Sequence, residues 1–345
     1  MKAIYFTQQG GPEVLIYGDL LEPTPGRGEV MVRVRATALN HLDLFRRAGS
    51  RGTGSATTEP FVLGSDIAGE VLQLGEGVTG LKTGDRVILN PGITCGRCEY
   101  CVTGRDNMCK SYRMIGSAVN GGYAQYVKAP QENAHVLTAD ISWTDAAAMP
   151  LTYLTAYHML ITLARLRAGE TVLIQAVGSG VGSAAFQVAK LAGARTIVTA
   201  GSNAKLEKAK SLGANETINY TTQDFAQRVK ELTGGDGADV VFDHVGAAIW
   251  QKNFDCIKRG GRFLNCGVTS GYKAELHMGQ MFTKQVTLFG SFMGNKSDMV
   301  DVVRLINQGK LRPVVDETFP LEDARKAHER MEDRNLFGKL VLTTP

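Results

Sequence analysis

The chain has 345 residues, of which 43% are hydrophobic and 21% are charged, and its formal net charge is +4. This composition is typical of a globular protein with an ample core, and the length favours two domains. The basic cluster Arg46, Arg47 and Arg51 is too small for a nucleic-acid footprint and predicts a solvated loop. No apolar run is long enough to span a membrane. We therefore expect a small-molecule substrate and neither a nucleic-acid nor a membrane partner.

Residues 1–90 alternate apolar and polar positions between glycine and proline turns, as in Lys2–Phe6, Glu29–Arg35 and Asp85–Leu89. Alternation with a period of two residues predicts half-buried strands, so this part is expected to form an antiparallel β domain. The segment Gly49–Pro60 is rich in glycine, serine and threonine and predicts a mobile surface loop.

Residues 91–112 form a cysteine lobe with the spacing C-x2-C-x2-C-x7-C, made by Cys95, Cys98, Cys101 and Cys109. Four thiolates on a short, glycine-containing loop can surround one tetrahedral ion, and four protein ligands leave no open position for catalysis. The spacing before the last cysteine does not fit a ferredoxin-like iron–sulfur site. We expect one structural zinc, with disulfides or free thiols as the alternative.

The other two cysteines, Cys256 and Cys266, fall in a predicted helix and strand and are expected in the core. Met1–Leu20 lacks a signal-peptide pattern. Cysteines in such a chain indicate a reducing compartment, so we expect a cytoplasmic protein.

Residues 142–166 predict two helical pieces divided at Pro150, because proline breaks a helix interior. Thr171–Gly193 then combines a buried strand, a glycine-rich turn and a helix, which is the first unit of a dinucleotide-binding fold. The glycines let a pyrophosphate approach the free N–H groups of the helix N-terminus. The turn residues expected to bind the cofactor are Gly178, Ser179, Gly180, Val181 and Gly182.

Strands and helices alternate from there to residue 308, which predicts an α/β fold with a doubly wound parallel sheet. The expected strands are Arg195–Thr199, Glu216–Asn219, Asp239–Asp243, Gly261–Cys266 and Gln285–Ser291, and the expected helices are 203–212, 222–232, 247–258 and 297–308. Gly246 and Gly267 follow two of the strands, at the end of the sheet where this fold binds its ligand. A helix at Leu321–Met331 and a strand at Gly338–Leu342 are expected to return the chain to the β domain.

Three further motifs, Gly10–Leu15, Gly84–Val87 and Gly121–Tyr123, join the cysteine spacing and the inserted nucleotide fold. Together they resemble the medium-chain dehydrogenase/reductase superfamily over the whole chain, both its zinc-type alcohol dehydrogenases and its quinone oxidoreductase branch. The resemblance implies a GroES-like β domain of residues 1–127 and 295–345 and a Rossmann-type domain of residues 128–294. It also implies a homodimer or homotetramer in which the edge strand around Gln285–Ser291 pairs with its symmetry mate.

The resemblance also locates the catalytic zinc site of the alcohol dehydrogenases. Its ligand positions fall on Asn40, on the pair Ser65 and Asp66, and on Leu151. Asparagine, serine and leucine cannot build such a site, which needs about three good ligands and one open position. His41 and Asp66 remain as possible ligands, but two are too few. The chain is therefore expected to keep the structural zinc and to lack the catalytic one.

The quinone oxidoreductase branch works without a catalytic metal, so the resemblance implies hydride transfer from NADPH to a quinone or to an α,β-unsaturated carbonyl or enoyl double bond. Hydrogen-bond donors then suffice to hold the developing enolate. The candidate catalytic residues are Asn40, His41, Asp43, Tyr153 and Thr155, with His41 and Tyr153 as candidate proton donors beside bulk water. Asp43 is expected to orient its neighbours or to cap the helix that begins there.

The expected cofactor is NADPH. An NAD-binding fold places an acidic residue at the end of its second strand, and here that position falls on Ala200. Ser202, Lys205 and Tyr220 match residues that hold the 2′-phosphate in the quinone oxidoreductase branch, and Lys339 is a further candidate for cofactor binding.

Two other functions remain open. One is an alcohol or aldehyde dehydrogenase with an atypical metal site, and the other is a non-catalytic NADPH-binding protein, since loss of zinc ligands can accompany loss of catalysis. The acceptor also remains open among quinones, enones, enals and enoyl thioesters.

Overall fold

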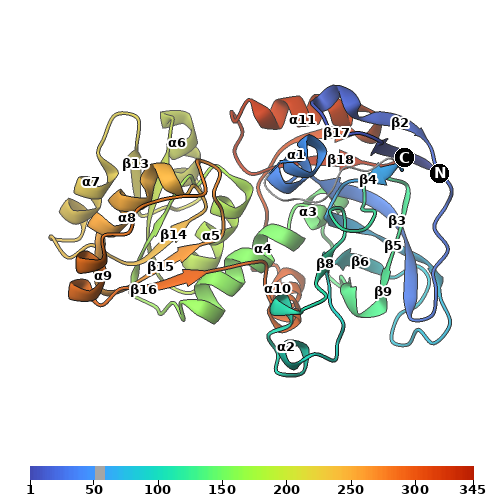
Figure 1. The fold of residues 1–345 in the computed structure, drawn as a ribbon, viewed down its shortest axis with the longest axis horizontal. Helices are drawn as coiled ribbons and strands as arrows, with labels where there is room; N and C mark the ends of the chain where they lie inside the picture. Colours follow the sequence, from blue (N-terminus) through green and yellow to red (C-terminus); the bar gives the residue numbers. More distant parts are fainter. Residues whose placement is uncertain (51–58) are drawn as a thin grey trace. The chain divides into compact units, whose positions relative to one another are not determined.

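The structure is a computed structural model that describes residues 1–50 and 59–345. The chain divides into two compact units, the first formed by Met1–Leu151 and Asn295–Pro345 and the second by Thr152–Gly294 (Figure 1). Arg51 and most of the predicted loop Gly49–Pro60 lie outside the described residues.

The first unit is built mainly of β-strands. Its strands are β1 (Lys2–Phe6), β2 (Ile16–Asp19), β3 (Glu29–Ala38), β4 (Phe61–Val62), β5 (Asp66–Leu74), β6 (Arg86–Leu89), β7 (Gly92–Ile93), β8 (Arg113–Met114), β9 (Tyr126–Pro130), β10 (Ala134–Val136), β17 (Val315–Pro320) and β18 (Lys339–Thr343). Its helices are α1 (His41–Ala48), α2 (Glu99–Val102), α3 (Trp143–Ala147), α10 (Lys296–Asn307) and α11 (Ala324–Glu332), and α4 (Pro150–Tyr157) begins in it.

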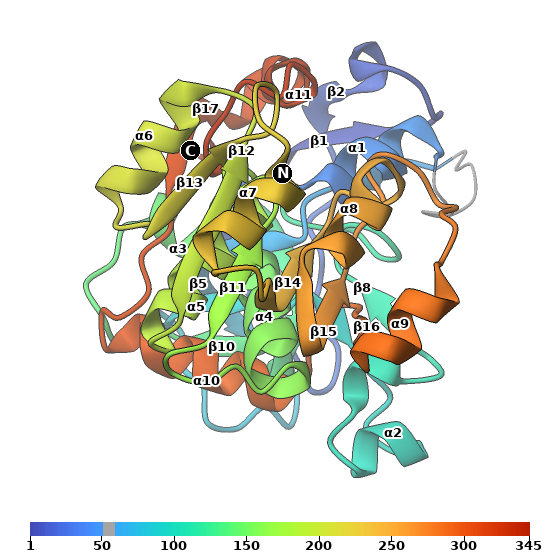
Figure 2. The ribbon, with the colours of Figure 1, turned by 90° about the vertical axis from the view of Figure 1, so that its left-hand side faces the viewer.

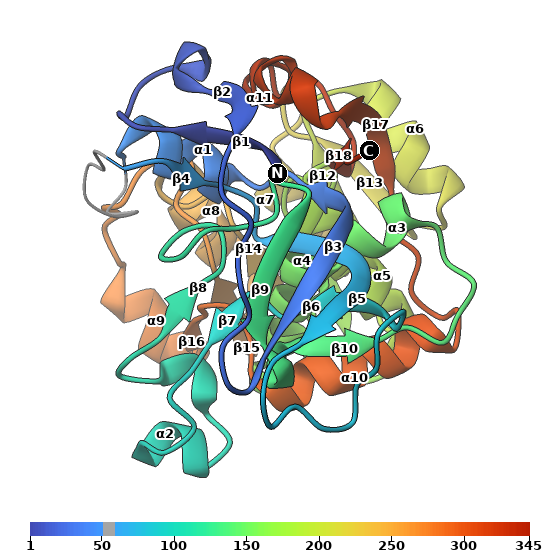
Figure 3. The same cartoon turned by 90° about the vertical axis from the view of Figure 1, so that its right-hand side faces the viewer.

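The main sheet of this unit has the strand order β10-β6-β5-β3-β18-β17, with β9 also paired to β3. Figure 3 shows β9, β3 and β5 side by side, and both pairings are antiparallel. Val30, Val32 and Val34 of β3 are buried in a cluster with residues of β5 and β6, which fits the predicted period of two. The C-terminal strand β18 pairs with β3, so the last residues of the chain complete a sheet begun by the first.

The second unit is a six-stranded parallel sheet with helices. Its strands are β11 (Thr171–Ile174), β12 (Arg195–Ala200), β13 (Glu216–Asn219), β14 (Ala238–Asp243), β15 (Ile257–Asn265) and β16 (Thr287–Gly290), and its helices are α5 (Gly180–Leu191), α6 (Asn203–Ser211), α7 (Phe225–Leu232), α8 (Trp250–Asp255) and α9 (Met278–Lys284). The order is β13-β12-β11-β14-β15-β16, and every pairing is parallel (Figure 2). This is the predicted doubly wound fold, and its order reverses between β11 and β14.

Several sequence-based boundaries differ from the structure. The first unit extends to Leu151 instead of residue 127, because β9 pairs with β3 and β10 pairs with β6. Helix α9 and strand β17 were not predicted, since neither has a clear hydrophobic period. The predicted division of residues 142–166 at Pro150 is confirmed, because α3 ends at Ala147 and Pro150 begins α4, and residues 158–163 continue that helix as a π-helix. No helix among residues 1–50 and 59–345 is long and apolar enough to cross a membrane.

Candidate active site and cofactor site

The four cysteines of the cysteine lobe converge. Their ligand atoms all lie within 4.8 Å of one another. The Sγ atoms of Cys95 and Cys98 lie 3.9 and 3.5 Å from that of Cys101, and the backbone N–H groups of Cys98 and Ser111 donate to the sulfurs of Cys95 and Cys109. Sulfurs at Zn–S bonds of about 2.3 Å lie about 3.8 Å apart in a tetrahedron, so this arrangement fits one zinc ion.

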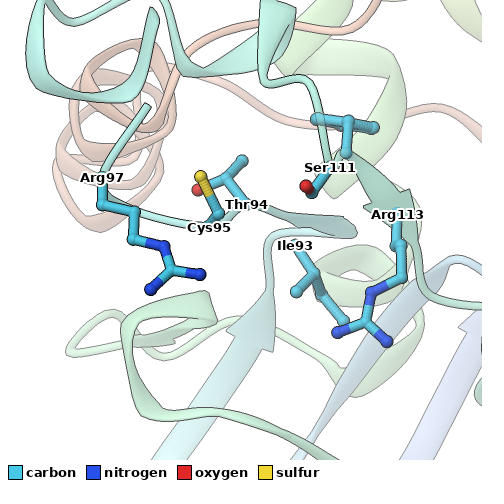
Figure 4. Close-up of a pocket in the computed structure, with 7 residues that line it drawn as sticks. Ile93, Thr94, Cys95, Arg97, Ser111 and Arg113 are labelled. Atoms are coloured by element: carbon cyan, nitrogen blue, oxygen red, sulfur yellow. The ribbon is translucent and has the colours of Figure 1, made fainter. Parts of the chain in front are cut away.

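The electrostatics of the lobe also suit a metal. Backbone N–H groups of Cys101 and Lys110 lower the pKa of the Cys98 thiol to about 6, which favours the thiolate that binds metal. A cavity of about 390 Å³ adjoins the lobe, where Cys95, Arg97 and Arg113 line it (Figure 4).

Of the two cysteines outside the lobe, Cys256 is buried as expected, but Cys266 is partly exposed because it follows the end of β15.

A buried polar cluster forms where β3, β5 and β18 meet in the first unit. The Lys339 ammonium donates to the carbonyl oxygen of Leu39 (2.6 Å), to Asn40 Oδ1 (2.6 Å) and to Asp66 Oδ2 (2.8 Å). Asp66 Oδ2 also accepts from Asn40 Nδ2 at 2.9 Å, and Asp66 Oδ1 accepts from the Leu151 N–H at 2.6 Å. Lys339 is 4% exposed and Asp66 is fully buried. The ammonium therefore has an oxygen acceptor for each of its three protons.

This cluster fixes the orientation of the Asn40 amide. Its oxygen faces the ammonium of Lys339 and its nitrogen faces the carboxylate of Asp66; the reverse orientation would oppose two donors. One proton of Asn40 Nδ2 goes to Asp66, so the nitrogen has a second proton to donate. Asn40 is 7% exposed.

Asp43 caps the start of α1. Its carboxylate accepts from the backbone N–H of Asn40 at 2.7 Å and from that of Gly64 at 3.1 Å. Burial raises the pKa of Asp43 to about 7, against the lowering effect of these hydrogen bonds. His41, the first residue of α1, is half-buried with its ring 6.1 Å from that of Phe45. Of the two roles predicted for Asp43, the structure shows the cap.

Arg46 and Arg47 correct the prediction of a solvated basic loop. Both lie on α1 and are buried. Arg46 donates to the carbonyl oxygen of Ser117 and lies over the ring of Phe61, while Arg47 pairs with Glu332 at 2.5 Å. The amphipathic spacing of α1 turns these side chains inward, so they hold the helix in place.

The second unit carries the glycine turn between β11 and α5. Ser179 is the N-cap of α5, and its Oγ accepts from the Gly182 N–H at 2.9 Å and lies 2.8 Å from His244 Nε2. A Cβ on Gly182 would lie 2.5 Å from the carbonyl oxygen of Ala176, so this position admits only glycine. The twelve-residue helix presents its N-terminal N–H groups at the carboxyl end of β11, which fits a pyrophosphate.

Gly246 and Gly267 lie beside each other at the ends of β14 and β15. Gly246 has a φ of +91°, and its Cβ would meet the backbone of Val268 and Gly267. The Asp243 carboxylate accepts from the N–H groups of Val245 and Gly246, and burial raises its pKa to about 6. A Cβ at either glycine would meet neighbouring backbone atoms, so neither position can place a side chain in the predicted cofactor site.

The predicted 2′-phosphate residues gather at the end of β12. Ser202 is the N-cap of α6, and its Oγ accepts from the backbone N–H of Lys205. Tyr220 is 48% exposed, and a Cβ on Gly201 would lie 2.7 Å from its hydroxyl. The side chains of Asn203 and Asn219 join α6 to β13 through a hydrogen bond of 2.7 Å. Ser202, Tyr220 and the start of α6 thus lie near one another, and their role in binding a 2′-phosphate stays a prediction.

Tyr153 and Thr155 lie on the part of α4 that belongs to the second unit, and both are buried. Asn40 and Asp43 belong to the first unit. Their grouping around one nicotinamide ring stays a prediction.

Comparison with known proteins identifies the family. The pattern described as "Alcohol dehydrogenase GroES-like domain" matches residues 26–139, and that described as "Zinc-binding dehydrogenase" matches residues 180–308. A quinone oxidoreductase of Pseudomonas aeruginosa is 33% identical, with 99% of each chain covered. The chain belongs to the medium-chain dehydrogenase/reductase superfamily.

Other relatives in this superfamily carry different activities in their names. An NAD-dependent alcohol dehydrogenase of Sulfolobus acidocaldarius is 33% identical with 99% of each chain covered, and an acryloyl-coenzyme A reductase of Metallosphaera sedula is 32% identical with 94% of this chain and 95% of the relative covered. A solved structure named NAD-dependent alcohol dehydrogenase superposes with a TM-score of 0.95 at 45% identity, and both chains are fully covered. These relatives establish an oxidoreductase, and they leave open which of the two chemistries it catalyses.

The catalytic zinc of the superfamily's alcohol dehydrogenases does not fit this chain. The structure brings the predicted ligand positions together, since Asn40 and the Leu151 N–H both donate to the Asp66 carboxylate. The groups around this carboxylate are therefore an amide, a backbone N–H and the Lys339 ammonium, all of which are hydrogen-bond donors. Ser65 donates its hydroxyl proton to the carbonyl oxygen of Ile115. The one carboxylate at these positions is already neutralised by Lys339, so the donor set lacks the ligands that a zinc ion needs.

Sequence analysis missed two partners in these sites. Lys339 was predicted to bind the cofactor, and that role stays a prediction, but the pairing with Asp66 across 273 residues of sequence was not foreseen. Nor was the contact of His244 with Ser179. The available signals were a lysine in an otherwise apolar C-terminal strand and a histidine at the end of a buried one.

Proposed function

We propose that this protein is an NADPH-dependent reductase that transfers a hydride to the double bond of an α,β-unsaturated carbonyl or enoyl substrate, or to a quinone, without a catalytic zinc. The single observation that carries the proposal is the Lys339–Asp66–Asn40 cluster, in which an amide occupies one expected zinc-ligand position and a lysine ammonium pairs with the carboxylate at another. Relatives named quinone oxidoreductase and acryloyl-coenzyme A reductase support it.

Asn40 is the donor that stabilises the developing negative charge. A bound nicotinamide cofactor supplies the hydride, which adds to the β-carbon of the substrate while the π-electron pair moves toward the carbonyl oxygen. The second proton of Asn40 Nδ2 can bond to that oxygen, and the Lys339 ammonium on Oδ1 polarises the amide and strengthens this donor. One such donor is worth about 3 kcal/mol of transition-state stabilisation. The α-carbon then takes a proton from His41, Tyr153 or water.

The preference for NADPH over NADH rests on the end of β12. No carboxylate stands at the end of this strand, because Ala200 is its last residue and Gly201 and Ser202 follow it. The N-terminus of α6 together with Ser202, Lys205 and Tyr220 is suited to a phosphate group. Lys205→Glu should weaken NADPH at least tenfold more than NADH, because it places a carboxylate against the 2′-phosphate; equal losses for both would contradict the assignment.

The strand β16 is proposed as the dimer contact. It lies at the end of the sheet, Leu288 on it is 39% exposed, and Phe282 on the neighbouring α9 is 70% exposed. An exposed apolar edge strand invites pairing with a second copy. Sedimentation at micromolar concentration should give a dimer or tetramer, and Leu288→Lys should shift it toward the monomer.

The deciding experiment measures oxidation of NADPH and NADH with enones, quinones, enoyl thioesters and ketones, beside reduction of NAD⁺ and NADP⁺ with simple alcohols. We expect turnover with an electron-poor double bond or a quinone. Asn40→Ala should lower kcat about 100-fold while the dissociation constant of NADPH stays within twofold. Oxidation of simple alcohols that is lost on chelation would instead identify a metal-dependent alcohol dehydrogenase, as the names of other relatives suggest.

A further inference from the structure

Ser179 and His244 meet at the point where the strand order of the second unit reverses. Strands β11 and β14 are neighbours, and the chain leads from β11 toward β12 and β13 but from β14 toward β15 and β16 (Figure 2). Ser179 lies in the turn after β11 and His244 directly follows β14, with 2.8 Å between Oγ and Nε2. In doubly wound sheets a dinucleotide crosses the carboxyl ends of the strands at this point.

The hydroxyl of Ser179 has one proton and two acceptor positions. One acceptor position takes the N–H of Gly182, which caps α5. The bond to His244 can run in either direction. If Ser179 donates to the imidazole, its proton is used up; if the imidazole donates to Ser179, the hydroxyl proton is available to a third group.

Contacts to both the backbone and the ring hold His244 in place. Its carbonyl oxygen accepts from Thr269 Oγ1 at 3.3 Å, and a Cβ on Gly267 would lie 2.6 Å from that oxygen. The imidazole packs at 60° to the ring of Phe242 with the centroids 6.2 Å apart, and His244 is 8% exposed. A side chain fixed in this way loses little conformational freedom when a ligand binds.

We propose that His244 is a positioning residue for the pyrophosphate of the bound cofactor. It donates from Nε2 to Ser179 Oγ and thereby turns the Ser179 hydroxyl proton toward a phosphate oxygen at the N-terminus of α5. An anion there favours this direction of the bond, because a hydroxyl proton aimed at phosphate makes a charge-assisted hydrogen bond. The proposal rests on the dinucleotide-binding part of the proposed function and is independent of the acceptor.

The test compares ligands with and without the pyrophosphate. ADP-ribose carries the pyrophosphate and no nicotinamide, and adenosine carries no phosphate. His244→Phe keeps a ring beside Phe242 and should weaken ADP-ribose about tenfold by calorimetry, while adenosine binding, followed by ligand-detected NMR, changes less than twofold. His244→Gln places an amide N–H near the position of Nε2 and should recover most of the affinity.

A double-variant cycle separates positioning from a general structural role. Ser179→Ala should also weaken ADP-ribose, and in that background His244→Phe should cost less than twofold, because the imidazole acts through the hydroxyl. The ¹⁵N shifts of His244 in the ADP-ribose complex should show a protonated Nε2. Full additivity of the two variants, equal loss for adenosine, or an unprotonated Nε2 in the complex would overturn the proposal. A wild-type protein that binds no ADP-ribose would overturn the proposed function as well.

Discussion

The cysteine lobe and the Lys339–Asp66–Asn40 cluster are the two places at which a zinc-type member of this superfamily holds a metal, and they differ in the source of their positive charge. The lobe gathers four sulfurs within 4.8 Å, and backbone N–H groups bond to those of Cys95 and Cys109. The cluster holds one carboxylate and supplies its own cation, the ammonium of Lys339. Thiolates crowded in this way repel one another until a cation binds, whereas the cluster is already neutral.

Within the first unit, the lobe offers four thiol ligands to a cation, whereas the cluster compensates its carboxylate with protein groups. A buried carboxylate needs a compensating charge and saturated hydrogen bonds, and Asp66 obtains both from protein groups.

Removing one thiol should abolish zinc binding by the cysteine lobe. Cys98→Ser should reduce the zinc content from about one per chain to near zero and unfold residues 91–112, since a structural zinc supplies the folding energy of such a loop. Plasma emission spectrometry gives the metal content, and limited proteolysis reports the loop. The affinity of the variant for ADP-ribose should stay within twofold of that of the wild type. If wild-type protein purified without chelators contained no zinc, this interpretation of the lobe would be refuted.

Removing the cation of the cluster should destabilise the protein without changing its metal content. Lys339→Met leaves Asp66 charged and unpaired in a buried site, which costs about 3–5 kcal/mol of unfolding free energy. The control is Lys2→Met, which breaks an ion pair of similar length, 2.7 Å, between side chains that are 44% and 74% exposed, and should destabilise the protein far less than Lys339→Met. Urea unfolding measures both. Equal costs would mean that the buried ammonium does not compensate Asp66.

Removing the Asn40 amide should lower the free energy of unfolding by less than removing the Lys339 ammonium does. Asn40→Ala removes one acceptor of the Lys339 ammonium and one donor to Asp66, so we expect a loss of about 1–3 kcal/mol. Asn203→Ala is the control, because Asn203 is exposed and its side chain makes a single hydrogen bond of 2.7 Å with Asn219; it should cost below about 1 kcal/mol. An Asn40 variant as stable as this control would show that the cluster does not depend on the amide.

The contrast also explains what sequence alone could predict. The cysteine spacing is local, so the lobe was predicted residue by residue and the structure brings all four together. Strands with strong apolar runs were placed well, and Glu216–Asn219 was placed to the residue. The pairing of Lys339 with Asp66 joins residues 273 positions apart through the β18–β3–β5 order, which no local pattern encodes. The buried positions of Arg46 and Arg47 likewise follow from the packing of α1, and their charge had suggested the opposite.

The remaining expected effect is a difference in pH dependence. Burial raises the pKa of Asp43 from an ordinary value of 3.8 to about 7, so the folded protein binds this proton more tightly than the unfolded chain. Its contribution to stability is therefore complete below about pH 4 and is lost as the pH rises through 7. The Cys98 thiol behaves in the opposite way. Its pKa is lowered from 9.0 to about 6, so its contribution is present above pH 9 and is lost as the pH falls through 6.

Urea unfolding between pH 5 and pH 8 tests this opposition. Asp43→Asn removes a titrating group whose contribution falls with rising pH, so relative to the wild type its unfolding free energy should rise with pH by up to about 1.4 kcal/mol per unit. Asp19→Asn is the control, because Asp19 is exposed and Lys2 lowers its pKa below 3.8, outside this range. Zinc retention by the wild type should fall over the same interval toward acid, as protons compete for the thiolates. Parallel slopes for the wild type and Asp43→Asn would show that Asp43 stays ionised, and the environment beside Asn40 would then be more polar than its burial implies.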